Sequence, residues 1–345
     1  MFNRKNNKTY ITIAEILRGT EAGRMQSVGY MQVIPLTSEL QDKAFASPDE
    51  TVVGTTNYGT MVFENPTDGI LIVPTHAGYI VSQSAQNHAM AHAGIVGKET
   101  SKSYNTAMCV QQTQGGFITK GKHKLSILPF SLREKALKIR DTTSYNKLWG
   151  EITKFNKNFG LAGSGHLEYF MSHFEKELNQ FVAEFECVPK QIGAIVLLNG
   201  EVIGIERAPN YAYWKAVWPA LIRECYGSRA IEYQYQMGNK TEVSKARFAL
   251  DDENIKTLED LKAALKTAEK KEGEFAKKAV RDLLDMPFEV KPEERTDGYT
   301  VSTVEQDQFT GQVVHDKDII AYASLLVRKG WGKKSKWKKA KAFSL

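Results

Sequence analysis

The stretch from Gln191 to Glu206 constrains the fold of this chain more than any other. In QIGAIVLLNGEVIGIE, two apolar β-type runs flank the dipeptide Asn199-Gly200. Asn-Gly accepts the positive φ angles of a type I′ turn, whose twist matches that of two paired strands. Helical spacing follows over about residues 211–226, where Pro219 predicts a kink. The sequence therefore predicts a β-hairpin that leads into a kinked helix.

Patterns outside the hairpin favour an α+β fold. Residues 9–130 alternate apolar and polar residues between turn signals and lack long crossover helices, which predicts a mostly antiparallel sheet in the N-terminal half. Amphipathic helices and the hairpin are expected in the C-terminal half. Short helices are expected within residues 131–159, and one apolar stripe predicts a long helix over residues 167–185. The remaining predicted elements are a solvated helix near residues 258–265, an amphipathic segment over 275–284, and closing strands at 311–314 and 319–327.

Composition narrows the class of protein. Apolar residues make up 42% and charged residues 25% of the 345 residues, which is the balance of a packed globular chain. The cysteines Cys109, Cys187 and Cys225 are odd in number and form no CxxC pair, so we expect a reducing compartment and no metal site. No apolar run reaches the roughly 18 residues that a membrane span requires, and the first eight residues lead into no secretory segment. We expect no membrane span, no cofactor, and a cytoplasmic location, or a host cytoplasm or virion for a phage protein.

The net charge of +6 is concentrated at the C-terminal end. Residues 328–345 carry +8 and no acidic residue, so residues 1–327 carry a net charge of −2. Lysines neutralise phosphates and interleaved aromatic rings stack on bases, which predicts binding to nucleic acid or another polyanion. An acidic protein, an anionic lipid surface and a role in solubility remain alternatives. The predicted nucleic-acid-binding residues are Arg328, Lys329, Trp331, Lys333, Lys334, Lys336, Trp337, Lys338, Lys339 and Lys341.

The hairpin and the helix after it carry a resemblance to a known family. IGAIVLLNGEVIG at residues 192–204 and WKAVWPALI at residues 214–222 resemble the central signature of the bacterial and phage ADP-ribosylglycohydrolase- and rhodanese-phosphatase-superfamily-associated protein domain family. Three upstream elements are similar to family motifs and follow in the family's order: Ala85-Gln86-Asn87-His88, Cys109-Val110-Gln111-Gln112 and Trp149-Gly150-Glu151-Ile152. The resemblance implies an N-terminal extension of residues 1–17, a family-like α+β domain over 18–327 with a less matched stretch near 235–265, and a basic aromatic tail of residues 328–345.

The resemblance implies a role in NAD or ADP-ribose metabolism, and the departures from it favour binding over catalysis. The family's acidic pair is replaced within Gly78-Tyr79-Ile80-Val81, its arginine by His88 and a glutamate by Gln111. The predicted ligand-binding residues are Gln86, Asn87, His88 and Gln111, with His92 nearby. Their amide and imidazole groups could contact a nucleobase or ribose of an adenine nucleotide. The alternative is a polar loop that satisfies its own backbone.

Other candidate residues have an ordinary structural interpretation beside the functional one. Gly163-Ser164-Gly165 could offer backbone N–H groups to a phosphate, although Ser164 as a helix cap is the simpler interpretation. Cys109 could be a nucleophile or a small buried hydrophobe. Glu151 and the pair Glu206-Arg207 could serve as acid–base groups or as surface ion pairs.

Three functions stay open on sequence alone. The first is an accessory protein that binds an NAD- or ADP-ribose-type nucleotide, and the second is a phage particle or nucleic-acid-associated structural protein. The third is an enzyme acting on ADP-ribose derivatives, which the lost acidic residues disfavour. A homo-oligomer is compatible with each.

Overall fold

A computed structural model describes residues 9–80, 86–113, 115–237, 255–281, 283–285, 287–316 and 319–328. The predicted basic tail lies outside the described residues except for Arg328. Val81 and Ala85 of the family-like motifs, residues 1–8 of the predicted extension and most of the less matched stretch also lie outside them.

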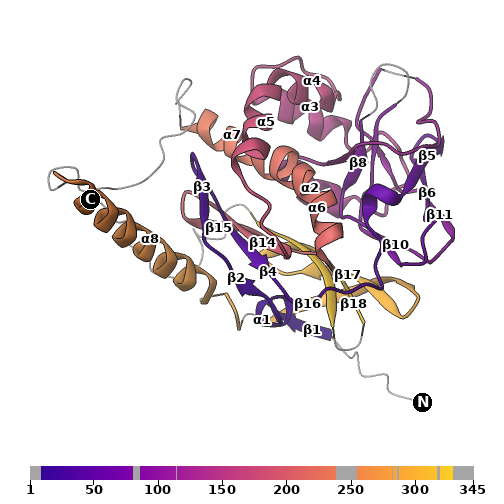
Figure 1. Cartoon of the computed structure of the whole chain (residues 1–345). Helices are drawn as coiled ribbons and strands as arrows, with labels where there is room; N and C mark the ends of the chain where they lie inside the picture. The colour runs from indigo at the N-terminus through magenta and orange to yellow at the C-terminus, as the bar shows by residue number, and fades with distance from the viewer. Residues whose placement is uncertain are drawn as a thin grey trace.

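A 10-stranded antiparallel sheet forms the base of the molecule (Figure 1). Its strand order is β1-β16-β17-β18-β19-β15-β14-β4-β2, with β3 also paired to β4. The strands are β1 (Thr9–Thr12), β2 (Glu21–Ala22), β3 (Gln26–Val28), β4 (Met31–Thr37), β14 (Gln191–Leu198), β15 (Glu201–Arg207), β16 (Pro287–Thr296), β17 (Tyr299–Glu305), β18 (Phe309–His315) and β19 (Ile320–Val327).

The predicted hairpin forms the centre of this sheet. Asn199 and Gly200 have φ angles of +51° and +81°, as a type I′ turn requires. All eight residues of β14 are buried, and they alternate between two cores: Ala194 and Val196 face the helical layer, while Ile195 and Leu197 face the opposite side. The hairpin prediction is confirmed, and its strands are covered on both faces.

A layer of helices lies on one side of the sheet (Figure 1). They are α2 (Phe130–Lys138), α3 (Trp149–Lys157), α4 (Leu167–His173), α5 (Glu175–Glu184), α6 (Tyr211–Ala220) and α7 (Gly227–Gln236), with the π-helix η2 (Leu221–Tyr226) between the last two. Of these, α3 and α4 lie farthest from the sheet (Figure 1). The short α1 (Ile13–Ile16), the 3-10 turn η1 (Pro48–Glu50) and the long α8 (Leu258–Arg281) complete the helical elements of the described residues.

Two helix predictions need correction. The long helix expected over residues 167–185 breaks at Phe174, which has φ −105° and ψ 23° and whose ring packs against Phe159 and Tyr235. Near Pro219, where a kink was expected, the helix changes type, since the wide π turn begins two residues later. The two helical segments expected near 258–265 and 275–284 are largely one helix, α8.

The rest of the N-terminal half forms three small antiparallel sheets beside the helical layer (Figure 1, upper right). This confirms the mostly antiparallel pairing expected there. The sheets are β11-β6-β5, β10-β7 and β12-β9-β8-β13, built from β5 (Val52–Asn57), β6 (Thr60–Glu64), β7 (Leu71–Val73), β8 (Ala77–Tyr79), β9 (His88–Ala89), β10 (Gly94–Val96), β11 (Ser101–Tyr104), β12 (Met108–Cys109) and β13 (Leu125–Ile127).

The closing strands predicted near the C-terminal end are confirmed as β18 and β19, whereas β16 and β17 were not expected. No helix among the described residues has the length and apolarity that crossing a membrane demands.

Candidate functional site

Strand pairing brings the three family-like motifs together. Cys109 on β12 lies opposite His88 on β9, and the Val110 N–H donates to the Asn87 carbonyl at 2.8 Å. The Cys109 N–H donates to the carbonyl of Tyr145, shortly before α3 begins at Trp149. We call the residues gathered here the amide cluster: Gln86, Asn87, His88, Cys109, Gln111, Gln112, Trp149 and Glu168.

A chain of side-chain hydrogen bonds runs through the amide cluster toward the surface. Nδ2 of Asn87 donates to Oε1 of Gln111 at 2.5 Å, and Nε2 of Gln111 donates to Oε2 of Glu168 at 3.1 Å. Asn87 and Gln111 are 1% and 5% exposed, whereas Glu168 is half-buried. The relay therefore begins in the interior and ends on a carboxylate at the edge of the cluster.

The loop before α4 places Glu168 at the end of this relay. The Leu167 N–H donates to the Val110 carbonyl at 2.9 Å, and the Gly165 N–H donates to Oε1 of Gln112 at 2.8 Å. A Cβ on Gly165 would lie 2.8 Å from the Trp149 side chain, so the loop packs closely against α3. The expected capping role of Ser164 is wrong, because His166 is the N-cap residue and no side chain caps the helix.

Both ring nitrogens of His88 have partners within the chain. The Gly59 N–H donates to Nε2 at 3.1 Å, so the proton lies on Nδ1, which donates to the Gln86 carbonyl at 2.7 Å. Burial lowers the pKa of His88, and its bond to Gln86 opposes this shift. A neutral His88 thus orients Gln86. His92 contacts Ala93 and Thr106 instead and does not join the cluster.

The side-chain oxygen of Gln86 accepts no hydrogen bond from the described residues. The residue is 6% exposed, and within the described part of the chain its Oε1 has no hydrogen-bond partner. An unsatisfied buried polar atom costs about 1–3 kcal/mol. A water molecule or a ligand donor at this oxygen would remove that cost.

Cys109 has the surroundings of a structural cysteine. It is fully buried, and burial raises the pKa of its thiol, although the Gln111 backbone and the Trp149 indole oppose the rise. A thiol is a poor nucleophile, since the thiolate is the reactive form. The interpretation of Cys109 as a small buried hydrophobe fits this environment better than nucleophilic catalysis does.

Four aromatic residues lie at, or next in sequence to, residues that belong to the amide cluster or form hydrogen bonds with it. The centroid of the Tyr58 ring lies 5.1 Å from that of Phe117 and 5.3 Å from that of Tyr145. Tyr145 in turn packs edge-on against Trp149, with centroids 5.6 Å apart. Tyr169 stacks on His166, with centroids 4.8 Å apart. Tyr58, Phe117 and Tyr169 are 42%, 45% and 43% exposed. We call Tyr58, Phe117, Tyr145 and Tyr169 the aromatic rim.

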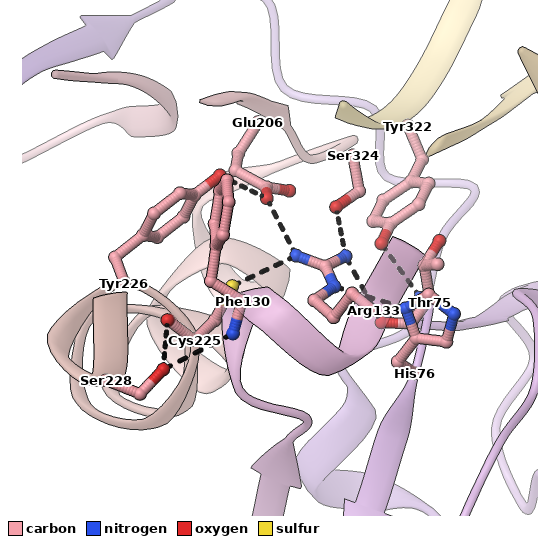
Figure 2. Close-up of polar contacts among 10 residues, drawn as sticks. All are labelled: Thr75, His76, Phe130, Arg133, Glu206, Cys225, Tyr226, Ser228, Tyr322 and Ser324. Carbon is pink, nitrogen blue, oxygen red and sulfur yellow. Dashed lines mark hydrogen bonds and ion pairs between the residues drawn. The ribbon is translucent and has the colours of Figure 1, made fainter. Parts of the chain in front are cut away.

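A second polar cluster lies in the interior around Arg133 of α2 (Figure 2). Its guanidinium donates from Nη2 to Oγ of Ser324 at 2.7 Å and from Nε to Nδ1 of His76 at 3.1 Å. Nη1 lies 3.4 Å from Oε1 of Glu206 and 3.2 Å from the Cys225 sulfur. We call this the arginine cluster: Thr75, His76, Arg133, Glu206, Cys225, Tyr226, Tyr322 and Ser324.

The arginine cluster joins the sheet, the helices and the small sheets. Glu206 on β15 lies directly opposite Ser324 on β19. Tyr226, from the π-helix, donates to Oε1 of Glu206 at 2.8 Å, and the Thr75 N–H donates to the Tyr322 hydroxyl at 2.9 Å. These hydrogen bonds connect the large sheet, the helical layer and the small sheets at one place.

Electrostatics keep Arg133 charged in this closed site. Burial alone lowers the pKa of Arg133, but the neighbouring Cys225 and Glu206 reverse that effect and raise it above its ordinary value. Burial raises the pKa of Glu206, and Arg133 opposes the rise. Burial and then Arg133 hold the pKa of His76 well below its usual value. The cluster is a buried ion pair with a neutral histidine.

The acid–base candidates separate into buried and exposed residues. Glu206 is 2% exposed, so the surface-pair interpretation is wrong for it. Arg207 donates to the carbonyls of Ile16 and Arg18. Glu151 does form a surface pair, with Lys154 at 2.8 Å.

Two central residues escaped the sequence analysis. Glu168 gives no sequence signal, because only the fold brings it to Gln111. Arg133 lies at helical spacing from Phe130 and Leu137, which are both buried. An arginine on the apolar face of a helix was the sequence signal that could have predicted a buried charge. Among the described residues, no group of three or more His, Cys, Asp or Glu side chains could hold a metal ion.

A family model described as ARG and Rhodanese-Phosphatase-superfamily-associated Protein domain matches residues 19–324. The match agrees with the resemblance noted over residues 18–327 and includes both polar clusters. No curated protein and no solved structure matches the chain.

Proposed function

Because the chain belongs to the ARG and Rhodanese-Phosphatase-superfamily-associated Protein domain family, we propose that it is an accessory binding protein for an NAD- or ADP-ribose-type nucleotide. The family name associates it with ADP-ribosylglycohydrolases, which suits an accessory role beside enzymes of ADP-ribose metabolism. The base or the ribose of the nucleotide would lie at the amide cluster.

One observation carries the proposal. Three segments far apart in the sequence converge on a set of buried carboxamides, and one of them, Gln86, has an unused acceptor in the described structure. Carboxamides offer donors and acceptors that match the edges of bases and the hydroxyls of ribose. The aromatic rim supplies exposed ring faces on which a base can stack.

Binding suits these residues better than catalysis. The Cys109 thiol is buried with a raised pKa, and both nitrogens of His88 have partners within the chain. Neither offers an activated nucleophile or a free proton acceptor. An enzyme acting on ADP-ribose derivatives stays the alternative, and turnover of ADP-ribose by the purified protein would favour it.

Isothermal titration calorimetry of the full chain with ADP-ribose and NAD tests the proposal. Tyr58→Ala and Phe117→Ala should weaken binding about tenfold, since base stacking contributes about 1–3 kcal/mol per base. Tyr10→Ala removes a tyrosine that is 54% exposed on β1, outside the aromatic rim, and serves as the matched control. No heat of binding at millimolar ligand would overturn the proposal.

A second candidate function rests on the basic tail alone. Eight basic residues interleaved with aromatics suit a nucleic-acid-associated or phage particle protein. Deleting residues 328–345 should abolish DNA binding and its salt dependence. Equal binding by the truncated chain, with the same salt slope, would contradict this role for the tail.

A further inference from the structure

We infer that Glu168 selects the ligand at the amide cluster by accepting hydrogen bonds from the paired hydroxyls of a ribose, so that the phosphates of a nucleotide point away from it. The inference rests on the proposed function and specifies which part of the nucleotide the cluster receives. The carboxylate is the group that meets the ligand, and the amides behind it set its position.

All hydrogen bonds of the relay point in the same direction, from the Asn87 amide toward the Glu168 carboxylate. Nδ2 of Asn87 faces Oε1 of Gln111 at 2.5 Å, which turns Nε2 of Gln111 outward to the Glu168 carboxylate at 3.1 Å. A carboxylate only accepts hydrogen bonds, whereas an amide nitrogen only donates. What the relay presents to a ligand is therefore an acceptor, and the complementary ligand group is a donor such as a hydroxyl.

Glu168 retains capacity for such donors. Gln111 uses Oε2, and none of the residues that the structure describes donates a hydrogen bond to Oε1. Within the same residues, no lysine or arginine forms an ion pair with Glu168. Glu168 is half-buried, and the next residue, Tyr169, is 43% exposed.

Charge and geometry together favour a diol over a phosphate. A phosphate brought to Glu168 would meet a like charge, which disfavours both groups at close range. Two neighbouring hydroxyls can each donate to one carboxylate oxygen, as acidic residues do for ribose in dinucleotide-binding folds. Tyr169 follows Glu168 in α4, and its exposed ring stacks on His166.

Calorimetry with adenosine, 2′,3′-dideoxyadenosine and ADP-ribose tests the inference. Glu168→Gln should lose about tenfold or more in affinity for adenosine and ADP-ribose, and it should bind the dideoxy compound as the wild type does. Glu168→Asp keeps the carboxylate on a shorter side chain. Its affinity for adenosine and ADP-ribose should lie between those of the wild type and Glu168→Gln.

The controls separate the possible failures. Glu177→Gln changes a half-buried glutamate in the first turn of the adjacent helix α5 and should bind like the wild type. If the wild type binds none of the three ligands, the proposed function fails. If the wild type binds them but Glu168→Gln keeps the same preference for the diol, the proposed function stands and the role of Glu168 is overturned.

Discussion

The amide cluster and the arginine cluster are both buried and polar, but they differ in charge and in access. The arginine cluster encloses an ion pair between α2 and β15, and Arg133 and Glu206 are 1% and 2% exposed. The amide cluster joins neutral carboxamides to the half-buried Glu168 beside exposed rings. The comparison indicates that the first holds layers together, while the second has polar atoms within reach of the surface, where we propose that a ligand binds.

Removing the arginine should produce the largest effect. Arg133→Met leaves Glu206 buried without its cation, which should lower the free energy of unfolding by about 3–5 kcal/mol. Urea denaturation followed by circular dichroism measures this. Adding Glu206→Gln to the same chain should recover part of the loss. A single variant as stable as the wild type would show that the arginine cluster does not fasten the layers.

Gly165→Ala should have the next largest effect and acts on the amide cluster. The new methyl group would lie 2.8 Å from the Trp149 side chain, so the loop or the indole must shift. Such overpacking costs about 1–3 kcal/mol. Nucleotide affinity should fall with it, because the same loop positions Glu168. Gly150→Ala, at a site with nothing within 4 Å of the new Cβ, is the control.

Lowering the pH should reduce the free energy of unfolding, because each cluster contains a histidine whose pKa is lowered in the folded chain. The folded pKa values of His76 and His88 lie below their ordinary value. As the pH falls from about 6.5 toward these lowered values, the unfolded chain binds protons that the folded chain does not, so the free energy of unfolding falls. His76→Asn, compatible with the φ of +61° at this position, should flatten the profile, because burial and Arg133 both lower the pKa of His76. His88→Gln should flatten it as well, because burial lowers the pKa of His88. Urea midpoints between pH 5 and 8 would decide this.

The surface pair Glu151–Lys154 should matter least. Its partners are 30% and 72% exposed, and exposed pairs contribute about 0–1 kcal/mol. Glu151→Gln should therefore leave the urea midpoint nearly unchanged. A loss comparable with that of Arg133→Met would contradict the distinction between enclosed and exposed charges.

Local signals made much of the fold predictable. Asn199-Gly200 specifies a turn through its own backbone preferences, and the apolar periodicity of α2, α3 and α6 reflects one buried face. Strand β16 escaped because PFEVKPEERT is rich in Pro and Glu, which disfavour strands, and its pairing with β1 and β17 supplies what the local sequence lacks. The break at Phe174 depends likewise on distant aromatic partners.

The candidate site was predictable only in part. Gln86, Asn87, His88 and Gln111 were named from a resemblance, and the fold brings them together. Their roles as ligand contacts stay predictions. Glu168 could not be found this way, because its contact with Gln111 spans 57 positions and depends on a loop held by backbone hydrogen bonds. The tail residues beyond Arg328 lie outside the described part of the chain.

The π-helix after Pro219 makes the chain tolerate one change of length at that point and not the other. Its wider turn holds about one residue more than an α-helical turn, so deleting a residue there would convert it to an α turn and leave α7 on the same face. Ser228 would still accept from the Phe130 N–H, and Glu232 would still accept from the Ser131 hydroxyl. Inserting one more residue within residues 221–226 would instead rotate α7 by about 100° about its axis and separate both pairs, so an insertion there should be more damaging than a deletion.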